Sequence, residues 1–257
     1  MSDTPSSAPR AGKDESDPFK LRHDAEEPPV HVFGKGENIV CATEGLARPR
    51  NRGVNINELV VGVGNSIPLW AEGVKLYWRF QPRSFSAFAD PERAKARIRA
   101  LMQKALDLWG DAAPIAFEER DKGWDFEVVL SAGDNCNSRG CVLASAFFPD
   151  GGRHRMMIYP RMLQQVEQEQ VETMVHEIGH IFGLRHFFAK VSENQLASEV
   201  FGTHVRFSIM NYGADSYVTD EDRSDLKELY RLARSRELRA INGTEILLVR
   251  PFSAMMG

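Results

Sequence analysis

HEIGHIFGLRH, residues 176–186, is the stretch on which the interpretation of the whole chain depends. His176 and His180 are four residues apart, so on a helix their imidazoles lie on one face, one turn apart, as a zinc ion requires. Glu177 follows the first histidine, where its carboxylate can hold and deprotonate a zinc-bound water. The spacing therefore predicts a helix that carries two metal ligands and a general base.

The second half of the stretch predicts a third ligand. Gly183 can leave the helix in a backbone conformation that costs other residues a Cβ clash. That turn lets His186 return to the same metal. Three neutral imidazoles leave the fourth position of a zinc ion open, which is typical of a catalytic rather than a structural site. The alternative is a chance match on a surface helix.

The complete pattern H-E-x-x-H-x-x-G-x-x-H resembles the signature of the metzincin zinc endopeptidases. SIMNYG, residues 208–213, is similar to the Met-turn of that family. The resemblance implies that Met210 forms a soft floor under the imidazoles without binding the metal. It also implies that the Tyr212 hydroxyl can hydrogen-bond the oxyanion of a tetrahedral intermediate. A tyrosine that only packs in the turn is the alternative for Tyr212.

The same resemblance implies a zinc-dependent endopeptidase of α+β (α/β metzincin-like) class. Its expected parts are a mixed five-stranded sheet, an active-site helix, a Met-turn and a C-terminal helix. Strands are expected near residues 74–80, 115–119, 125–131, 141–149 and 154–160. The alternative function is a zinc-bearing module that binds peptides or proteins without cutting them.

Local signals place three helices. Asp90-Pro91-Glu92 is a helix start with a capping aspartate and a proline in the first turn, and Thr219 with Asp222 forms a capping box for the last helix. A Gln/Glu-rich helix is expected from about Met162 to the zinc motif. The helix after Asp90 has an apolar stripe that predicts a buried face, comprising Ala94, Ile98, Leu101, Met102, Ala105, Leu108 and Trp109.

Composition divides the chain into three parts. Residues 1–68 form an N-terminal extension whose first part is polar enough to be disordered, and which is a possible pro-segment. Residues 69–235 are the expected catalytic domain, and residues 236–257 a C-terminal tail. The chain has 257 residues, 42% of them apolar, and a net charge of −4, so no basic patch for nucleic acid is expected.

The apolar runs are too short to span a membrane, and the N-terminus has no apolar segment typical of a signal peptide. We therefore expect a chain that stays inside the cell, leaves it by a leaderless route, or has lost its leader.

Two segments bear on the branch of the family. Residues 105–119 and VLASAFFP, residues 142–149, look like the first helix and the edge strand of matrixins. The 24 residues that follow His186, up to Met210, look more like the longer connection of serralysins and astacins, so the branch stays open. An edge strand at 143–148 would bind a protein or peptide substrate as an added extended strand. Ser145 stands where matrixins place a ligand of a second zinc, which makes a second zinc at His154 unexpected.

The three cysteines raise two questions. Cys136 and Cys141 are close enough in sequence to form a short disulfide outside a reducing cytosol, or remain two free thiols. In matrixins a cysteine thiolate of a pro-segment, in a switch motif, fills the open zinc position until the segment is cut. The resemblance therefore implies that Cys41, which precedes the catalytic domain, could do the same. The flanking residues NIVCATEGLARPRNRG do not match the matrixin switch motif. We therefore favour Cys41 as a small buried residue of the N-terminal arm.

Overall fold

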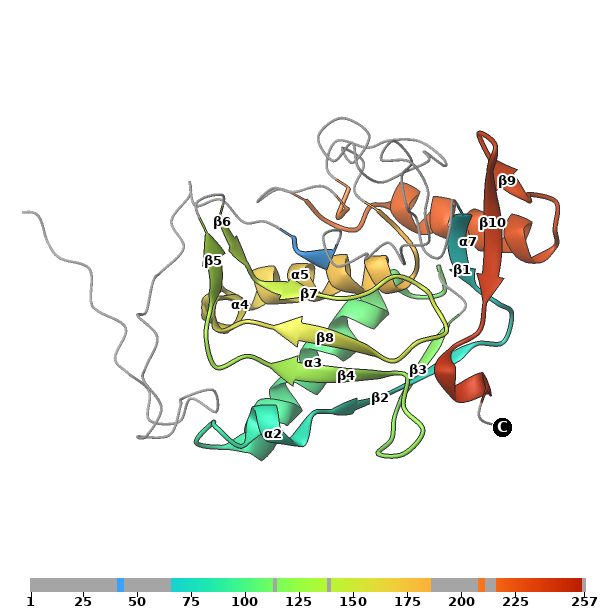
Figure 1. Ribbon diagram of the computed structural model, residues 1–257. Coiled ribbons are helices and arrows are strands. Elements are labelled where there is room, and N and C mark those ends of the chain that lie inside the picture. The colour runs from blue at the N-terminus through green and yellow to red at the C-terminus, as the bar shows by residue number, and fades with distance from the viewer. Residues whose placement is uncertain are drawn as a thin grey trace, which may run out of the picture.

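A mixed sheet with the strand order β3-β2-β4-β8-β7 forms the centre of the molecule (Figure 1). The computed structural model describes residues 41–43, 66–112, 115–137, 140–185, 208–210 and 216–255. The first four strands of this order are parallel, and β7 runs antiparallel to β8 at the edge. The strands are β2 (Lys75–Phe80), β3 (Ala116–Glu119), β4 (Phe126–Leu130), β7 (Ala144–Ser145) and β8 (His154–Ile158). The sheet and its helices agree with the predicted α+β class.

Helix α3 (Pro91–Trp109) starts and buries its apolar face as its sequence predicts. Asp90 caps the helix by accepting a hydrogen bond from the backbone N–H of Arg93, and the predicted apolar stripe is buried apart from one residue. Leu108 is 45% exposed, so its predicted burial is wrong. It lies instead beside a groove that Val171 and Tyr217 also line. The short helix α2 (Pro82–Phe85) precedes α3.

The helix expected from Met162 to the zinc motif is two helices, α4 (Pro160–Gln164) and α5 (Glu167–Ile181). Gln165 and Val166 between them are extended, with ψ angles of 164° and 152°. The side-chain amide of Gln170 donates to the carbonyls of Leu163 and Gln165, which gives those backbone groups partners at the break. Helix α5 packs against α3, where the Trp109 indole donates to the Val175 carbonyl.

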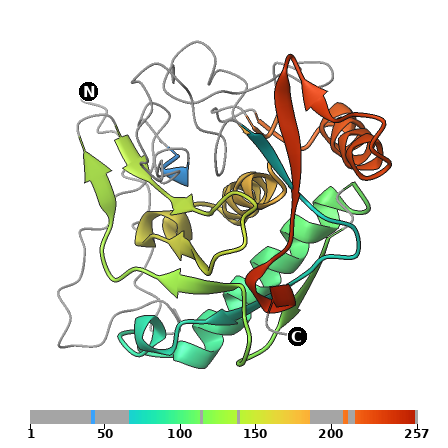
Figure 2. The ribbon, with the colours of Figure 1, turned by 45° about the vertical axis from the view of Figure 1, so that its right-hand side comes forward.

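A second, smaller sheet joins a strand that precedes the main sheet in the chain to two strands that follow it (Figure 2). Strand β1 (Ser66–Trp70) runs parallel to β10 (Thr244–Val249), and β10 forms a hairpin with β9 (Ala240–Ile241). Asn242 and Gly243 at the turn both have positive φ, of 47° and 89°, as a tight hairpin turn requires. The 3-10 helix η1 (Phe252–Met255) follows, and the side chain of Asp125 accepts from the Ser253 backbone and hydroxyl. The described part of the expected tail is thus regular structure paired to β1.

This small sheet contacts the C-terminal end of α5, where backbone carbonyls lack helical partners. The Trp70 indole donates to the Ile181 carbonyl at 2.7 Å, and the Tyr230 hydroxyl donates to the Phe182 carbonyl at 2.9 Å. Tyr230 comes from α7 (Asp220–Arg234), and burial raises the pKa of its phenol, which therefore remains a donor. The end of the zinc-motif helix is held from both sides.

A disulfide between Cys136 and Cys141 closes the hairpin of β5 (Asn135–Asn137) and β6 (Gly140–Val142). The structure thus decides between the two alternatives that the sequence left open. Among the described helices, none combines the length and apolarity that crossing a membrane would take.

Candidate metal centre

Helix α5 carries three side chains of the zinc motif to one place. His176 and His180 are one turn apart, and Glu177 lies between them in the chain. All three are buried, with exposures of 9% for His176, 2% for Glu177 and 0% for His180. Burial of a carboxylate beside two imidazoles is costly unless these groups have partners, so their contacts decide what the site can do.

The two imidazoles face each other through their Nε2 atoms, which are 3.1 Å apart. Each ring uses its other nitrogen for a backbone carbonyl: Nδ1 of His176 lies 2.7 Å from the Ile209 oxygen, and Nδ1 of His180 lies 2.8 Å from the Leu184 oxygen. A carbonyl only accepts, so this network assigns the hydrogen to Nδ1 in both rings. Both Nε2 atoms then present lone pairs to the same point, the arrangement that a metal-binding histidine pair adopts.

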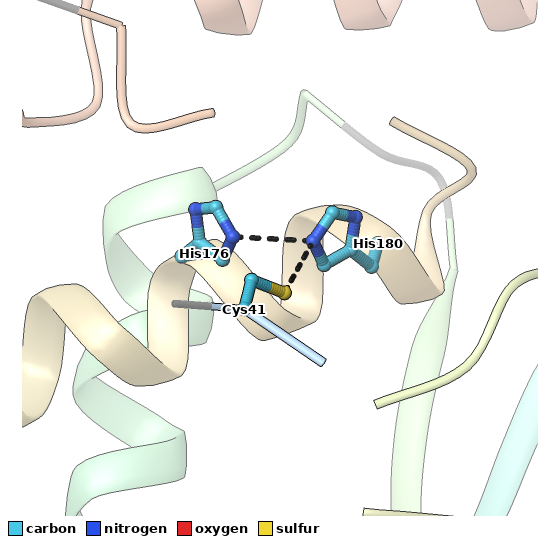
Figure 3. Close-up of side chains that lie close together, drawn as sticks. All are labelled: Cys41, His176 and His180. Atoms are coloured by element: carbon cyan, nitrogen blue, oxygen red, sulfur yellow. Dashed lines mark hydrogen bonds between the residues drawn. The ribbon is translucent and has the colours of Figure 1, made fainter. Parts of the chain in front are cut away.

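A thiol completes this cluster (Figure 3). The Cys41 sulfur lies 3.4 Å from Nε2 of His180 and 3.7 Å from Oε1 of Glu177. The candidate ligand atoms of Cys41, His176 and His180 all lie within 4.8 Å of one another. Two imidazole nitrogens and a sulfur that converge in this way fit the donor preferences of zinc.

The position of Cys41 corrects the interpretation that the sequence favoured. Its thiol faces the histidines instead of packing in an apolar arm. Figure 1 shows residues 41–43, in blue, beside α5 and β7. This position could not be predicted, because the residues around Cys41 do not match the matrixin switch motif.

Gly183 makes the turn that the sequence predicts. Its φ is +95°, and a Cβ atom there would lie 3.0 Å from both the Leu69 side chain and the Pro68 carbonyl oxygen. The turn also directs the Leu184 carbonyl back to His180, so it orients a candidate ligand. His186, the predicted third histidine, lies outside the described residues.

Residues 208–210 pack against α5. Met210 is buried, and its sulfur lies so close to Gly179 that a Cβ atom there would approach it to 2.6 Å. The Ile209 carbonyl is the one that His176 contacts. The remaining residues of the predicted Met-turn, including Tyr212, lie outside the described part of the chain, so that turn stays a prediction.

The capping box of α7 holds residues 208–210 in place, a connection that the sequence does not predict. Asp222 accepts from the Ser208 hydroxyl at 2.6 Å and from the Ile209 N–H at 3.4 Å, besides its capping bond to the Thr219 N–H. Asp222 is therefore linked through Ile209 to the Nδ1 side of His176. The capping pattern was visible in the sequence, but nothing local indicated this second use of the carboxylate.

The edge of the main sheet borders the candidate site. Strand β7 pairs only with β8 within the described sheet, and the chain continues from it through Ala146 to Phe148. The Phe148 ring meets the His180 ring edge-on at 5.3 Å. The backbone N–H of Ala146 donates to the Thr43 hydroxyl at 2.7 Å. The strand expected to receive an extended peptide is thus next to the histidines.

His154 has protein partners of its own. Its imidazole lies 2.9 Å from Asp150 Oδ1 and stacks on the Phe147 ring, with centroids 4.2 Å apart. These contacts give His154 a role in packing the turn between β7 and β8.

Comparison with known proteins identifies the family. Residues 70–231 match the model of the matrixin family. A segment of 131 residues is 26% identical to macrophage metalloelastase from Rattus norvegicus, covering 47% of this chain and 27% of that protein. A segment of 105 residues is 26% identical to stromelysin-3 from Xenopus laevis, covering 36% of this chain and 22% of that protein. These matches span about a quarter of the relatives' length. The family match covers more than half of the chain and includes the zinc motif, so the chain belongs to the matrixin family.

Proposed function

We propose that this protein is a zinc-dependent endopeptidase in which His176, His180 and His186 bind the metal and Glu177 is the general base. The observation that carries the proposal is the place of the Glu177 carboxylate. Its Oε1 lies 3.7 Å from the Cys41 sulfur, which itself faces the convergent histidine nitrogens. A group held at the metal is therefore within reach of a buried carboxylate.

Each residue then has a defined task. Zinc, when bound, would polarise the scissile carbonyl and lower the pKa of water toward about 7. Glu177 takes the proton of the attacking water and delivers it to the leaving amine. The edge that continues from β7 binds the peptide as an extended strand, since its backbone groups can pair with any sequence.

Metal removal tests the proposal. Cleavage of casein or a peptide library should disappear after treatment with a chelator and return when zinc is added, because the histidines alone cannot polarise a carbonyl. Zinc should be quantified on the same samples. Cleavage that persists in metal-free protein would exclude a zinc enzyme. Stoichiometric zinc without cleavage, even after the N-terminal arm is removed, would favour a peptide-binding module.

Tyr212 is proposed to donate a hydrogen bond to the oxyanion. If its hydroxyl meets charge only in the transition state, Tyr212→Phe should lower kcat by about 10- to 100-fold with little change in KM. Steady-state kinetics on a single peptide measures both constants. An unchanged kcat would assign Tyr212 to packing in the turn.

A further inference from the structure

The Thr43 hydroxyl bridges two groups of the candidate active site. Its Oγ1 donates to Oε2 of Glu177 at 2.7 Å and accepts from the backbone N–H of Ala146 at 2.7 Å. Thr43 is 1% exposed, so both bonds are shielded from water. Hydrogen bonds to a charged carboxylate in such surroundings are stronger than those between neutral groups.

Thr43 and Cys41 contact different groups of the site. The Cys41 sulfur faces His180 and one oxygen of Glu177, while the Thr43 hydroxyl binds the other oxygen. The Thr43 N–H also donates to the Cys41 sulfur at 3.4 Å, which holds the two side chains in one orientation. The metal-facing position and the general base are thus covered by different residues.

The contact with Ala146 places Thr43 on the sheet edge where a peptide is proposed to bind, because Ala146 directly follows β7. A free N–H beside the edge strand is a donor that a substrate carbonyl would use. Here the Thr43 hydroxyl takes that donor. The Thr43 hydroxyl therefore donates a hydrogen bond to the Glu177 carboxylate and accepts one from the Ala146 N–H at the sheet edge.

We propose that the site binds Cys41-Ala42-Thr43 as a two-point ligand in which Thr43 is an anchor independent of the metal. The proposal rests on the proposed function, because it describes how the proposed peptidase site is inhibited. Cys41 contributes a thiol to the metal-facing position, and Thr43 contributes a hydroxyl to Glu177 and Ala146. Residues 41–43 then remain bound to the site when no metal is present.

Alkylation of Cys41 in zinc-free, full-length protein tests this directly. Cys41 is the cysteine outside the disulfide, which Cys136 and Cys141 form. The rate at which iodoacetamide labels the Cys41 sulfur, followed by mass spectrometry, therefore reports how often residues 41–43 leave the site. Thr43→Val keeps the shape and removes the hydroxyl, so labelling should be about 10-fold faster, the factor expected for the net loss of one to two hydrogen bonds.

Two control variants separate the hydroxyl from other effects. Thr43→Ser keeps the hydroxyl and should label at the wild-type rate. Thr244→Val makes the same chemical change on β10 and should also label like wild type. Equal labelling rates for Thr43→Val and the wild type would overturn the proposal. So would a Thr43→Ser variant that labels as fast as Thr43→Val, because packing of the methyl group would then be the cause.

Peptidase assays on zinc-loaded, full-length protein give a second measurement. Cys41→Ala leaves the Thr43 anchor, so adding Thr43→Val should raise its activity by about a further 10-fold. Equal activity of the single and double variants would contradict a second anchor. If the double variant cuts no peptide, the proposed function fails, whereas the labelling result still decides whether Thr43 anchors the arm.

Discussion

Glu177→Ala is expected to lower kcat/KM by at least about 100-fold while the zinc content stays near one per chain. The substitution removes a base without removing a ligand, since the two Nε2 atoms converge without the carboxylate. Proton transfer by a positioned base contributes about 10²–10⁴-fold in enzymes, which sets the size of the loss. The comparison belongs in protein that lacks the first sixty-odd residues, where neither Cys41 nor Thr43 contacts the site.

Kinetics on one peptide and metal analysis on the same preparation measure the two effects separately. Glu169→Ala is a matched control, because Glu169 is an exposed carboxylate on the same helix. It should leave both activity and zinc content unchanged. A Glu177→Ala protein that has lost its zinc would show that the carboxylate supports the metal and would leave its role as a base unproven.

Cys41→Ala is expected to raise the activity of the full-length protein by about 100-fold. The thiol lies 3.4 Å from Nε2 of His180, at the position where a metal would meet it. Zinc sites with four protein ligands have apparent binding free energies of about 10–16 kcal/mol, so one thiolate ligand accounts for a few kcal/mol of this total. Loss of that ligand frees the open position that catalysis requires.

The activity of Cys41→Ala is compared with that of full-length protein and of protein lacking the first sixty-odd residues, at equal zinc content. Cys41→Ser provides a graded control, because a hydroxyl is a poorer zinc ligand than a thiolate, and should fall between wild type and Cys41→Ala. If full-length wild-type protein is already as active as the truncated form, the arm does not silence the enzyme and its contact with the histidines has another purpose.

Local signals in the sequence were sufficient for the helices that support the site. Asp90 and Thr219 start their helices as predicted, because capping depends on residues only three positions apart. The spacing of His176 and His180 predicted their meeting for the same reason. The prediction of one strand over residues 141–149 was less accurate, because the paired residues form two short strands, β6 and β7. A continuous apolar run does not reveal where strand pairing stops.

Contacts between distant segments could not be predicted. Nothing near Thr43 indicates a partner at Glu177, and nothing near Ser66 indicates a parallel strand at the end of the chain. A hydroxyl or a short apolar run is compatible with many environments, so only the fold selects one. The break at Gln165 and Val166 has the same origin, since both residues are acceptable inside a helix.

The parallel pairing of β1 with β10 also sets the order in which a newly made chain can mature. Ser66 pairs with Glu245 and Trp70 with Val249, so the strand that supports the end of α5 can pair only after the chain has been made as far as β10. Such long-range pairing is slow to form, because the intervening chain must be ordered first. Residues 41–43 leave the ribosome long before β10. The segment that contacts the candidate metal ligands is therefore made before the small sheet can close around the end of α5.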